Sequence, residues 1–143
     1  MKPTETLEDT LIRHEGLRLK PYRCTAGKLT IGIGRNLDDI GISEAEARLM
    51  LRNDIISAEL QLQSSFPWFR RLDPLRQQIL TNMAFNLGIP RLRRFRRMLA
   101  NIERGDYERA ADEMLDSRWA QQVKGRATEL ARWMRSGEQG DAS

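Results

Sequence analysis

The sequence predicts a mixed fold in which one small β-hairpin precedes a long helix and a largely helical remainder. Between residues 19 and 34 apolar residues alternate with period two, whereas from Ser43 onward they recur every three or four positions. The 143 residues are 40% hydrophobic and 31% charged, as in an ordinary globular domain. We therefore expect one domain over residues 1–143. Its expected parts are an N-terminal lobe with connecting helix over about 1–64, a helical lobe over 65–136 and a flexible tail over 137–143.

The first expected element is a short helix over residues 4–14, with Leu7 and Leu11 on one face. Gly16 is a stop signal, which places Glu15 at the C-terminal end of this helix. The negative end of the helix dipole, and any burial, favour the protonated form of a carboxyl group. A general acid needs that form, so Glu15 is a candidate proton donor.

The period-two segment predicts a hairpin that pairs residues 21–24 with residues 28–33. Alternation places Thr30 on the same strand face as Gly32 and Gly34. Glycines in a strand often mark a close approach by a ligand or another backbone. We therefore expect this face to be the floor of a cleft.

Helix start signals organise the rest of the chain. Ser43 and Glu46 form a capping box, and the helix that follows should run to about Ser64. At 1.5 Å per residue that helix is roughly 30 Å long, enough to join two lobes. Asp73 followed by proline starts another helix, which should end at Gly88 and lie buried. Further helices are expected over about 91–102, 106–116 and 125–136, with a short turn near 117–123.

The residue counts exclude several classes of protein. The single Cys24 cannot form an intramolecular disulfide, and the single His14 argues against a zinc hydrolase or a Ser-His-Asp triad. No nucleotide-binding motif is present, so no metal or cofactor is expected. The chain has no run of about 18 apolar residues, and its acidic, periodic N-terminus does not resemble a signal peptide. We therefore expect synthesis in a cytoplasm, with no transmembrane segment.

Five arginines within seven residues make the positive charge local. The net charge is +4, so removing these five leaves the rest of the chain at −1. The simplest interpretation is the solvated face of a helix, and the functional alternative is attraction to an anionic membrane surface or lipopolysaccharide. Nucleic acid is not expected, because no recognised binding module is present. The arginines are Arg91, Arg93, Arg94, Arg96 and Arg97.

The segment HEGLRLKPYRCTAGKLTIGIGRNL resembles the catalytic segment of phage-type lysozymes, the endolysin muramidases typified by those of T-even bacteriophages. That family has the pattern Glu-x8-Asp/Cys-x5-Thr followed by Ile-Gly-Ile/Tyr-Gly, and Glu15, Cys24 and Thr30 match it. Residues 72–88 are similar to the central helix of the family's second lobe, and later blocks extend the similarity over most of residues 5–135.

The resemblance implies a lysozyme-like α+β fold with a small hairpin lobe, a long connecting helix and an all-helical second lobe. It also implies hydrolysis of the β-1,4 bond between N-acetylmuramic acid and N-acetylglucosamine in peptidoglycan. Glu15 is then the general acid and Thr30 lies beside the attacking water. Cys24 is either a thiolate base or a neutral thiol that places this water, and a neighbouring Arg13, Arg23 or Arg35 favours the thiolate. The residues expected to contact substrate are Gly34, Phe85 and Asn86.

Two alternatives are also compatible with the sequence. A lytic transglycosylase could use the same Glu15, and a non-catalytic protein could bind the wall or a membrane through residues 91–97. The resemblance further implies a monomer that waits in the host cytoplasm and is released to the periplasm with the help of a holin, a separate hole-forming protein.

Overall fold

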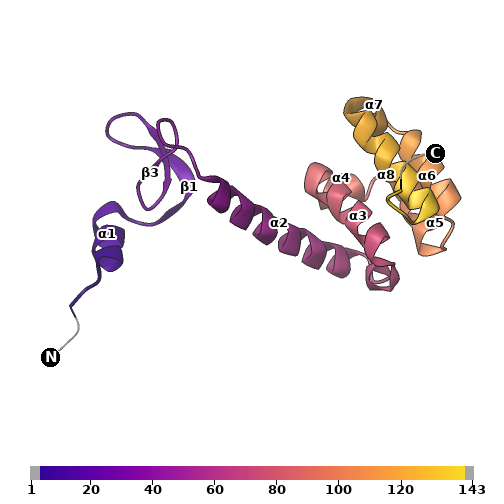
Figure 1. Cartoon of the computed structure of the whole chain (residues 1–143), viewed down its shortest axis with the longest axis horizontal. Coiled ribbons are helices and arrows are strands. Elements are labelled where there is room, and N and C mark those ends of the chain that lie inside the picture. The colour runs from indigo at the N-terminus through magenta and orange to yellow at the C-terminus, as the bar shows by residue number, and fades with distance from the viewer. Residues whose placement is uncertain (1–3, 141–143) are drawn as a thin grey trace. The chain divides into compact units, whose positions relative to one another are not determined.

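A computed structural model describes residues 4–140 and divides the chain into two compact units, Met1–Met50 and Leu51–Ser143 (Figure 1). The α+β class is confirmed, because a small antiparallel sheet in the first unit is followed by helices. Part of the expected tail, residues 141–143, lies outside the described residues.

The N-terminal unit begins with helix α1 (Leu7–Glu15), capped by Thr6, whose side chain accepts a hydrogen bond from the Asp9 N–H at 3.1 Å. The predicted hairpin is confirmed, and its strands belong to a three-stranded antiparallel sheet in the order β1-β2-β3. The third strand is not predicted by the sequence pattern. The strands are β1 (Arg18–Arg23), β2 (Leu29–Gly32) and β3 (Arg35–Asn36).

Helix α2 (Glu44–Ser65) has the capping box that the sequence predicts. The Glu46 N–H donates to Ser43 Oγ at 3.1 Å, and the Ser43 N–H donates to Glu46 Oε1 at 2.8 Å. Only Leu62 is buried among the 22 residues of α2. The apolar residues Leu49, Ile56 and Leu60 of this helix are each more than half exposed.

The C-terminal unit contains the seven short elements that follow α2. Helix α3 starts where predicted, with the Asp73 side chain accepting a hydrogen bond from the Arg76 N–H at 3.2 Å, and it ends at Gly88. The expected turn near 117–123 is instead mostly helical. The elements are η1 (Phe69–Arg71), α3 (Pro74–Leu87), α4 (Ile89–Leu92), α5 (Arg96–Glu103), α6 (Tyr107–Leu115), α7 (Arg118–Val123) and α8 (Gly125–Ser136).

The prediction of one helix over 91–102 is wrong. Helix α4 ends at Leu92, Phe95 adopts the non-helical angles φ −78° and ψ 57°, and α5 begins at Arg96. The Phe95 ring packs edge-on against Trp119, with ring centroids 6.1 Å apart. Leu92 is buried in the core, and the partly buried Phe95 packs against the same core.

A single apolar core lies in the C-terminal unit, between Leu62 and Met134. Helix α8 packs against α3, α6 and α7, and α5 packs against α6. Leu80, Met83 and Met114 are fully buried at the centre of this core. No helix within residues 4–140 combines the length and the apolar character needed to cross a bilayer.

Candidate active site

Glu15 is the last residue of α1. The next residue, Gly16, has φ +80°, and its N–H donates to the Ile12 carbonyl oxygen at 2.8 Å, which closes the final turn. The predicted place of Glu15 at the helix C-terminus is confirmed. Its side chain is exposed, so burial, the second influence considered from the sequence, is not observed.

The Glu15 carboxyl group lies close to the backbone of Gly34. A Cβ atom built on Gly34 would lie 2.7 Å from Glu15 Oε2 and 3.1 Å from Glu15 Cδ, closer than real side chains approach. Gly34 also has φ +72°, a left-handed conformation that disfavours other residues. Only glycine satisfies both conditions here, so Gly34 leaves the space that the Glu15 carboxyl group occupies against the backbone.

The position of Gly34 differs from the sequence-based prediction. Ile31 pairs with Arg35, so the chain turns back over Gly32, the last residue of β2, and then over Ile33 and Gly34. The alternation predicts a strand that continues to Ile33 with Gly34 on its bare face. Two glycines with positive φ instead turn the chain back, as three-residue hairpin connections require.

Cys24 directly follows β1 and opens the hairpin turn. Its N–H donates to the Lys28 carbonyl oxygen at 3.0 Å, and its own carbonyl oxygen accepts from the Gly27 N–H at 2.8 Å. Backbone hydrogen bonds from Lys28 and then Ala26 lower the pKa of the Cys24 thiol, and a weaker hydrogen bond from the Thr30 side chain acts in the same direction. The half-buried thiol is therefore a better source of thiolate than an ordinary cysteine.

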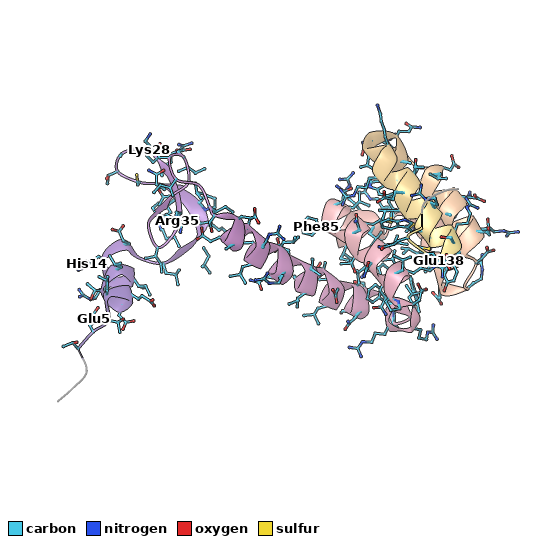
Figure 2. All side chains as sticks on the ribbon, viewed as in Figure 1. Glu5, His14, Lys28, Arg35, Phe85 and Glu138 are labelled. Atoms are coloured by element: carbon cyan, nitrogen blue, oxygen red, sulfur yellow. The ribbon has the colours of Figure 1, made fainter. Side chains whose placement is uncertain are left out.

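The arginines expected to lower this pKa have other partners. Arg13 pairs with Glu5 at 3.1 Å, and Arg23 donates to the Gly27 carbonyl oxygen at 3.1 Å. Arg35, which is labelled in Figure 2, pairs with Glu46 at 2.8 Å. The thiolate is thus favoured by peptide hydrogen bonds of the turn, and no guanidinium group is among the causes that lower the pKa of Cys24.

Thr30 lies in the central strand, where it pairs with Tyr22 on one side and Asn36 on the other. It is the one buried residue among residues 4–50, with 3% of its surface exposed. Its hydroxyl donates to the Lys28 carbonyl oxygen at 2.9 Å. Because a hydroxyl has one proton, the Thr30 hydroxyl must turn away from the Lys28 carbonyl oxygen to donate a hydrogen bond to a Cys24 thiolate.

The N-terminal unit therefore contains a carboxyl group that lies against Gly34 and a thiol and a hydroxyl group on the sheet that leads to this glycine. The carboxyl group can donate a proton. The thiol, with its lowered pKa, can accept one or orient a water molecule together with the hydroxyl. This set is suited to a reaction that cleaves a polar bond with acid assistance and adds water.

A model of the family described as phage lysozyme matches residues 12–140 of the chain. The chain belongs to the phage lysozyme family. The lysozyme-like fold class expected from the resemblance is confirmed, and the activity class is that of a lysozyme-type glycosidase.

Known relatives agree with this family assignment. An endolysin of Acyrthosiphon pisum secondary endosymbiont phage 1 is 33% identical, covering 82% of this chain and 80% of the relative. A probable T4-type lysozyme of Dictyostelium discoideum is 27% identical, covering 87% of this chain and 91% of the relative. The central spike protein Gp5 of the pre-baseplate of Enterobacteria phage T4 is 31% identical over 90% of this chain. This chain spans only 27% of that spike protein.

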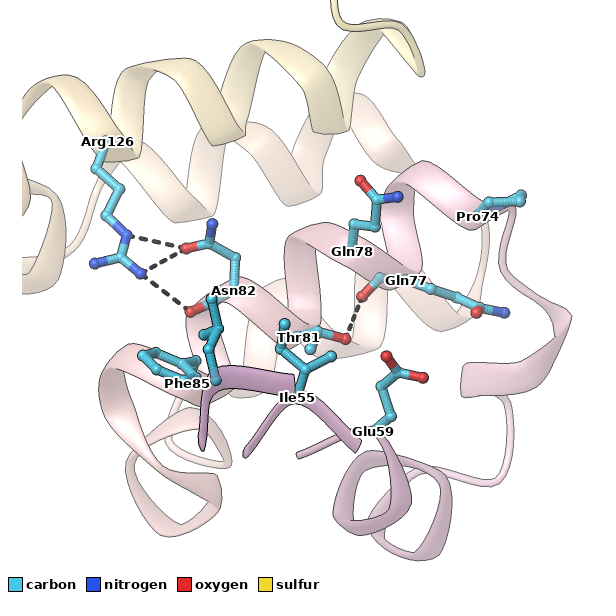
Figure 3. A pocket seen from close by; sticks show the side chains of 10 residues that line it. Ile55, Glu59, Pro74, Gln77, Gln78, Thr81, Asn82, Phe85 and Arg126 are labelled. Atoms are coloured by element: carbon cyan, nitrogen blue, oxygen red, sulfur yellow. Dashed lines mark hydrogen bonds between the residues drawn. The ribbon is translucent and has the colours of Figure 1, made fainter. Parts of the chain in front are cut away.

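The residues expected to contact substrate in the helical part of this lysozyme lie on α3. Phe85 is half exposed and lines a pocket of about 440 Å³ with polar residues of α3 (Figure 3). Arg126 closes one end of this pocket, where its Nε donates to Asn82 Oδ1 at 2.9 Å. Asn86 does not line the pocket, and its Oδ1 accepts from the Trp119 Nε1 at 2.8 Å. Its side-chain carbonyl oxygen is thus occupied in holding the core tryptophan.

Sequence reasoning missed one charged pair, which connects the sheet of this lysozyme to the start of α2. Arg35 of β3 binds Glu46 of α2, and this contact, with the Ser43 cap, lowers the pKa of Glu46 to about 2. The capping box predicted Glu46 as a helix cap only. No sequence signal marked Arg35 as its partner, because the third strand that positions Arg35 is only two residues long.

Proposed function

We propose that this lysozyme hydrolyses the β-1,4 bond between N-acetylmuramic acid and N-acetylglucosamine in peptidoglycan. The observation that carries the proposal is the seating of the Glu15 carboxyl group on Gly34, next to the sheet that holds Cys24 and Thr30. A glycosidase needs an acid at a fixed position and a means of delivering water to the other face of the sugar. The family match supports the class of reaction, and the Glu15, Cys24 and Thr30 pattern supports these roles.

In the proposed reaction Glu15 donates its proton to O4 of N-acetylglucosamine as the bond from this oxygen to C1 of N-acetylmuramic acid breaks. No second Asp or Glu occurs between Glu15 and Thr30, so a carboxylate from this segment does not activate the water. The Cys24 thiolate accepts a proton from water while the water oxygen bonds to C1, and the Thr30 hydroxyl orients this water. Proton transfer from the thiol back to Glu15 through solvent restores both groups.

The test is digestion of purified peptidoglycan by the wild type and by Glu15→Gln, followed by borohydride reduction and mass spectrometry of the products. Hydrolysis gives muramic acid ends that borohydride reduces. We expect Glu15→Gln to lose about 10²–10⁴-fold in rate, the usual contribution of general acid catalysis. Glu8→Gln is the matched control, because Glu8 is an exposed carboxylate on the same helix.

The outcomes of this digestion separate the alternatives. Products lighter by one water, with 1,6-anhydro ends, would make the protein a lytic transglycosylase. Failure of both proteins to release fragments would overturn the glycosidase proposal. Equal release by both would remove Glu15 from the mechanism.

The role of the thiol is tested by two substitutions at one position. Cys24→Asp should retain activity, because a carboxylate can also accept a proton from water. Cys24→Ala should lose most of it, and this comparison is made by the initial rate of wall clearing with each protein. Full activity in Cys24→Ala would show that the thiol is dispensable.

We further propose that the biological role is lysis of the host cell, as the endolysin relative suggests. Cells that express the wild type should then clear once their inner membrane is permeabilised, as a holin would do. Cells that express Glu15→Gln should stay turbid under the same treatment. Clearing with the variant would separate lysis from the glycosidase activity.

A further inference from the structure

The five arginines between residues 91 and 97 form what we call the arginine surface. All five are exposed, and within residues 4–140 none of their side chains pairs with a carboxylate or donates a hydrogen bond. Seven arginines elsewhere in this part of the chain do pair with carboxylates. The five are Arg91, Arg93, Arg94, Arg96 and Arg97. The arginine surface thus carries positive charge that the described protein does not neutralise.

The apolar residues between these arginines fix the direction in which they point. Leu92 is fully buried, Leu99 is 8% exposed, and Phe95 packs on the core against Trp119. These anchors hold the segment to the C-terminal unit and leave the arginines facing solvent. A helix that inserts into a bilayer needs its apolar face free, and here that face is already used. The arginine surface can therefore be attracted electrostatically to an anionic membrane without inserting into the bilayer.

The five charges lie within seven consecutive residues, at the end of α4, in the break and at the start of α5. All five charges are arginines rather than lysines. A guanidinium group presents a planar fork that binds phosphate oxygens in pairs and is less strongly hydrated than an ammonium group. The preferred partner therefore bears closely spaced phosphates.

The surroundings of the arginine surface favour a flat partner. Arg94, Arg96 and Arg97 line a hollow of about 400 Å³ that Glu113 and Asp116 also line. A duplex nucleic acid that enters this hollow meets these two carboxylates. A plane of lipid headgroups contacts only the protruding guanidinium groups.

We propose that the arginine surface binds the phosphate groups of an anionic phospholipid membrane, and that it binds at headgroup depth without disrupting the bilayer. This binding is independent of the proposed glycosidase activity. It holds the lysozyme at a membrane that borders its peptidoglycan substrate.

The experiment is co-sedimentation of the full chain with sucrose-loaded vesicles, either of pure phosphatidylcholine or with about 30% phosphatidylglycerol. We expect binding only to the anionic vesicles, with loss of binding as salt rises from about 20 to 300 mM. Each basic residue at such a surface is worth about five-fold in partitioning, so Arg96→Gln with Arg97→Gln should weaken binding about 25-fold.

The matched control is Arg52→Gln with Arg71→Gln. It removes the same charge from two exposed arginines that also lack ion pairs within the described residues. Equal loss of binding in both double variants would show a net-charge effect and would overturn the arginine surface as a site. Digestion of purified peptidoglycan should be unchanged in both, which keeps this test separate from that of the glycosidase.

Two further measurements can overturn the proposal. Release of a dye trapped in the anionic vesicles would contradict binding at headgroup depth, because Leu92 and Leu99 would have to leave the core. Tighter binding to a 20-base-pair duplex than to the vesicles at equal salt, lost in the Arg96 and Arg97 variant, would make the partner a nucleic acid.

Discussion

The two units of this lysozyme are stabilised by different interactions. Among residues 4–50 only Thr30 is buried, and the unit is held by backbone pairing, caps and exposed ion pairs such as Arg35 with Glu46. The C-terminal unit instead encloses a continuous apolar core from Leu62 to Met134. The unit with the candidate catalytic residues is thus the polar one. Its geometry depends on a few specific contacts, whereas the helical unit depends on the sum of many nonspecific ones.

The sharpest test of this difference is a pair of leucine truncations. Leu80→Ala removes a fully buried side chain from the helical core and should lower the free energy of unfolding by about 2–5 kcal/mol. Leu19→Ala in β1, where the side chain is 81% exposed, should change it by less than about 0.5 kcal/mol. Urea denaturation followed by circular dichroism measures both. A comparable loss in the two variants would show that the N-terminal unit also relies on apolar burial.

A second comparison changes the geometry of the candidate site and leaves the apolar core unchanged. Gly34→Ala combines a strained positive φ with a Cβ that collides with the Glu15 carboxyl group, so we expect a roughly ten- to hundred-fold fall in the rate of peptidoglycan cleavage. Gly105→Ala has the same strain at φ +79°, but nothing lies within 4 Å of its Cβ and it belongs to the unit without the candidate catalytic residues. Its cleavage rate should stay near that of the wild type. Equal falls in rate would assign the effect to backbone strain and would remove Gly34 as the seat of Glu15.

A third comparison lowers the pH, which should destabilise the N-terminal unit more than the C-terminal unit. The folded pKa of Glu46 is about 2, below the ordinary value of 4.5. The unfolded chain therefore binds the proton first as pH falls, and the stabilisation from the Arg35 pair is complete above about pH 4.5 and lost toward pH 2. Carbon NMR titration of the Glu46 carboxyl group should show this low midpoint, and Arg35→Gln should raise it. An unchanged midpoint in that variant would show that the pair does not cause the shift.

Much of the fold could be predicted because its boundaries are set by local chemistry. The Ser43 capping box and the Asp73 cap with its following proline lie where the sequence places helix starts. The spacing of Glu15, Cys24 and Thr30 indicates the candidate site directly in the sequence, because all three belong to one short segment. Each of these features depends on residues that lie near each other along the chain, so each can be predicted from the sequence alone.

The errors occurred where distant residues decide the conformation. Nothing between residues 91 and 102 is a helix breaker, and the interruption at Phe95 follows from its contact with Trp119, far along the chain. No arginine near Cys24 in sequence is among the groups that lower its pKa, and in the folded chain Arg13 pairs with Glu5 while Arg23 donates to the Gly27 carbonyl oxygen. The short strand β3 was missed because two residues carry no periodicity.

The division into two units also gives the molecule two natural optical reporters. Its three tryptophans, Trp68, Trp119 and Trp133, all belong to the helical unit, while its single thiol belongs to the other. Intrinsic fluorescence therefore follows the loss of the helical core and is not sensitive to the sheet. A thiol-reactive dye added during unfolding follows the sheet alone, so the order in which the two units melt can be recorded on the unmodified sequence in one cuvette.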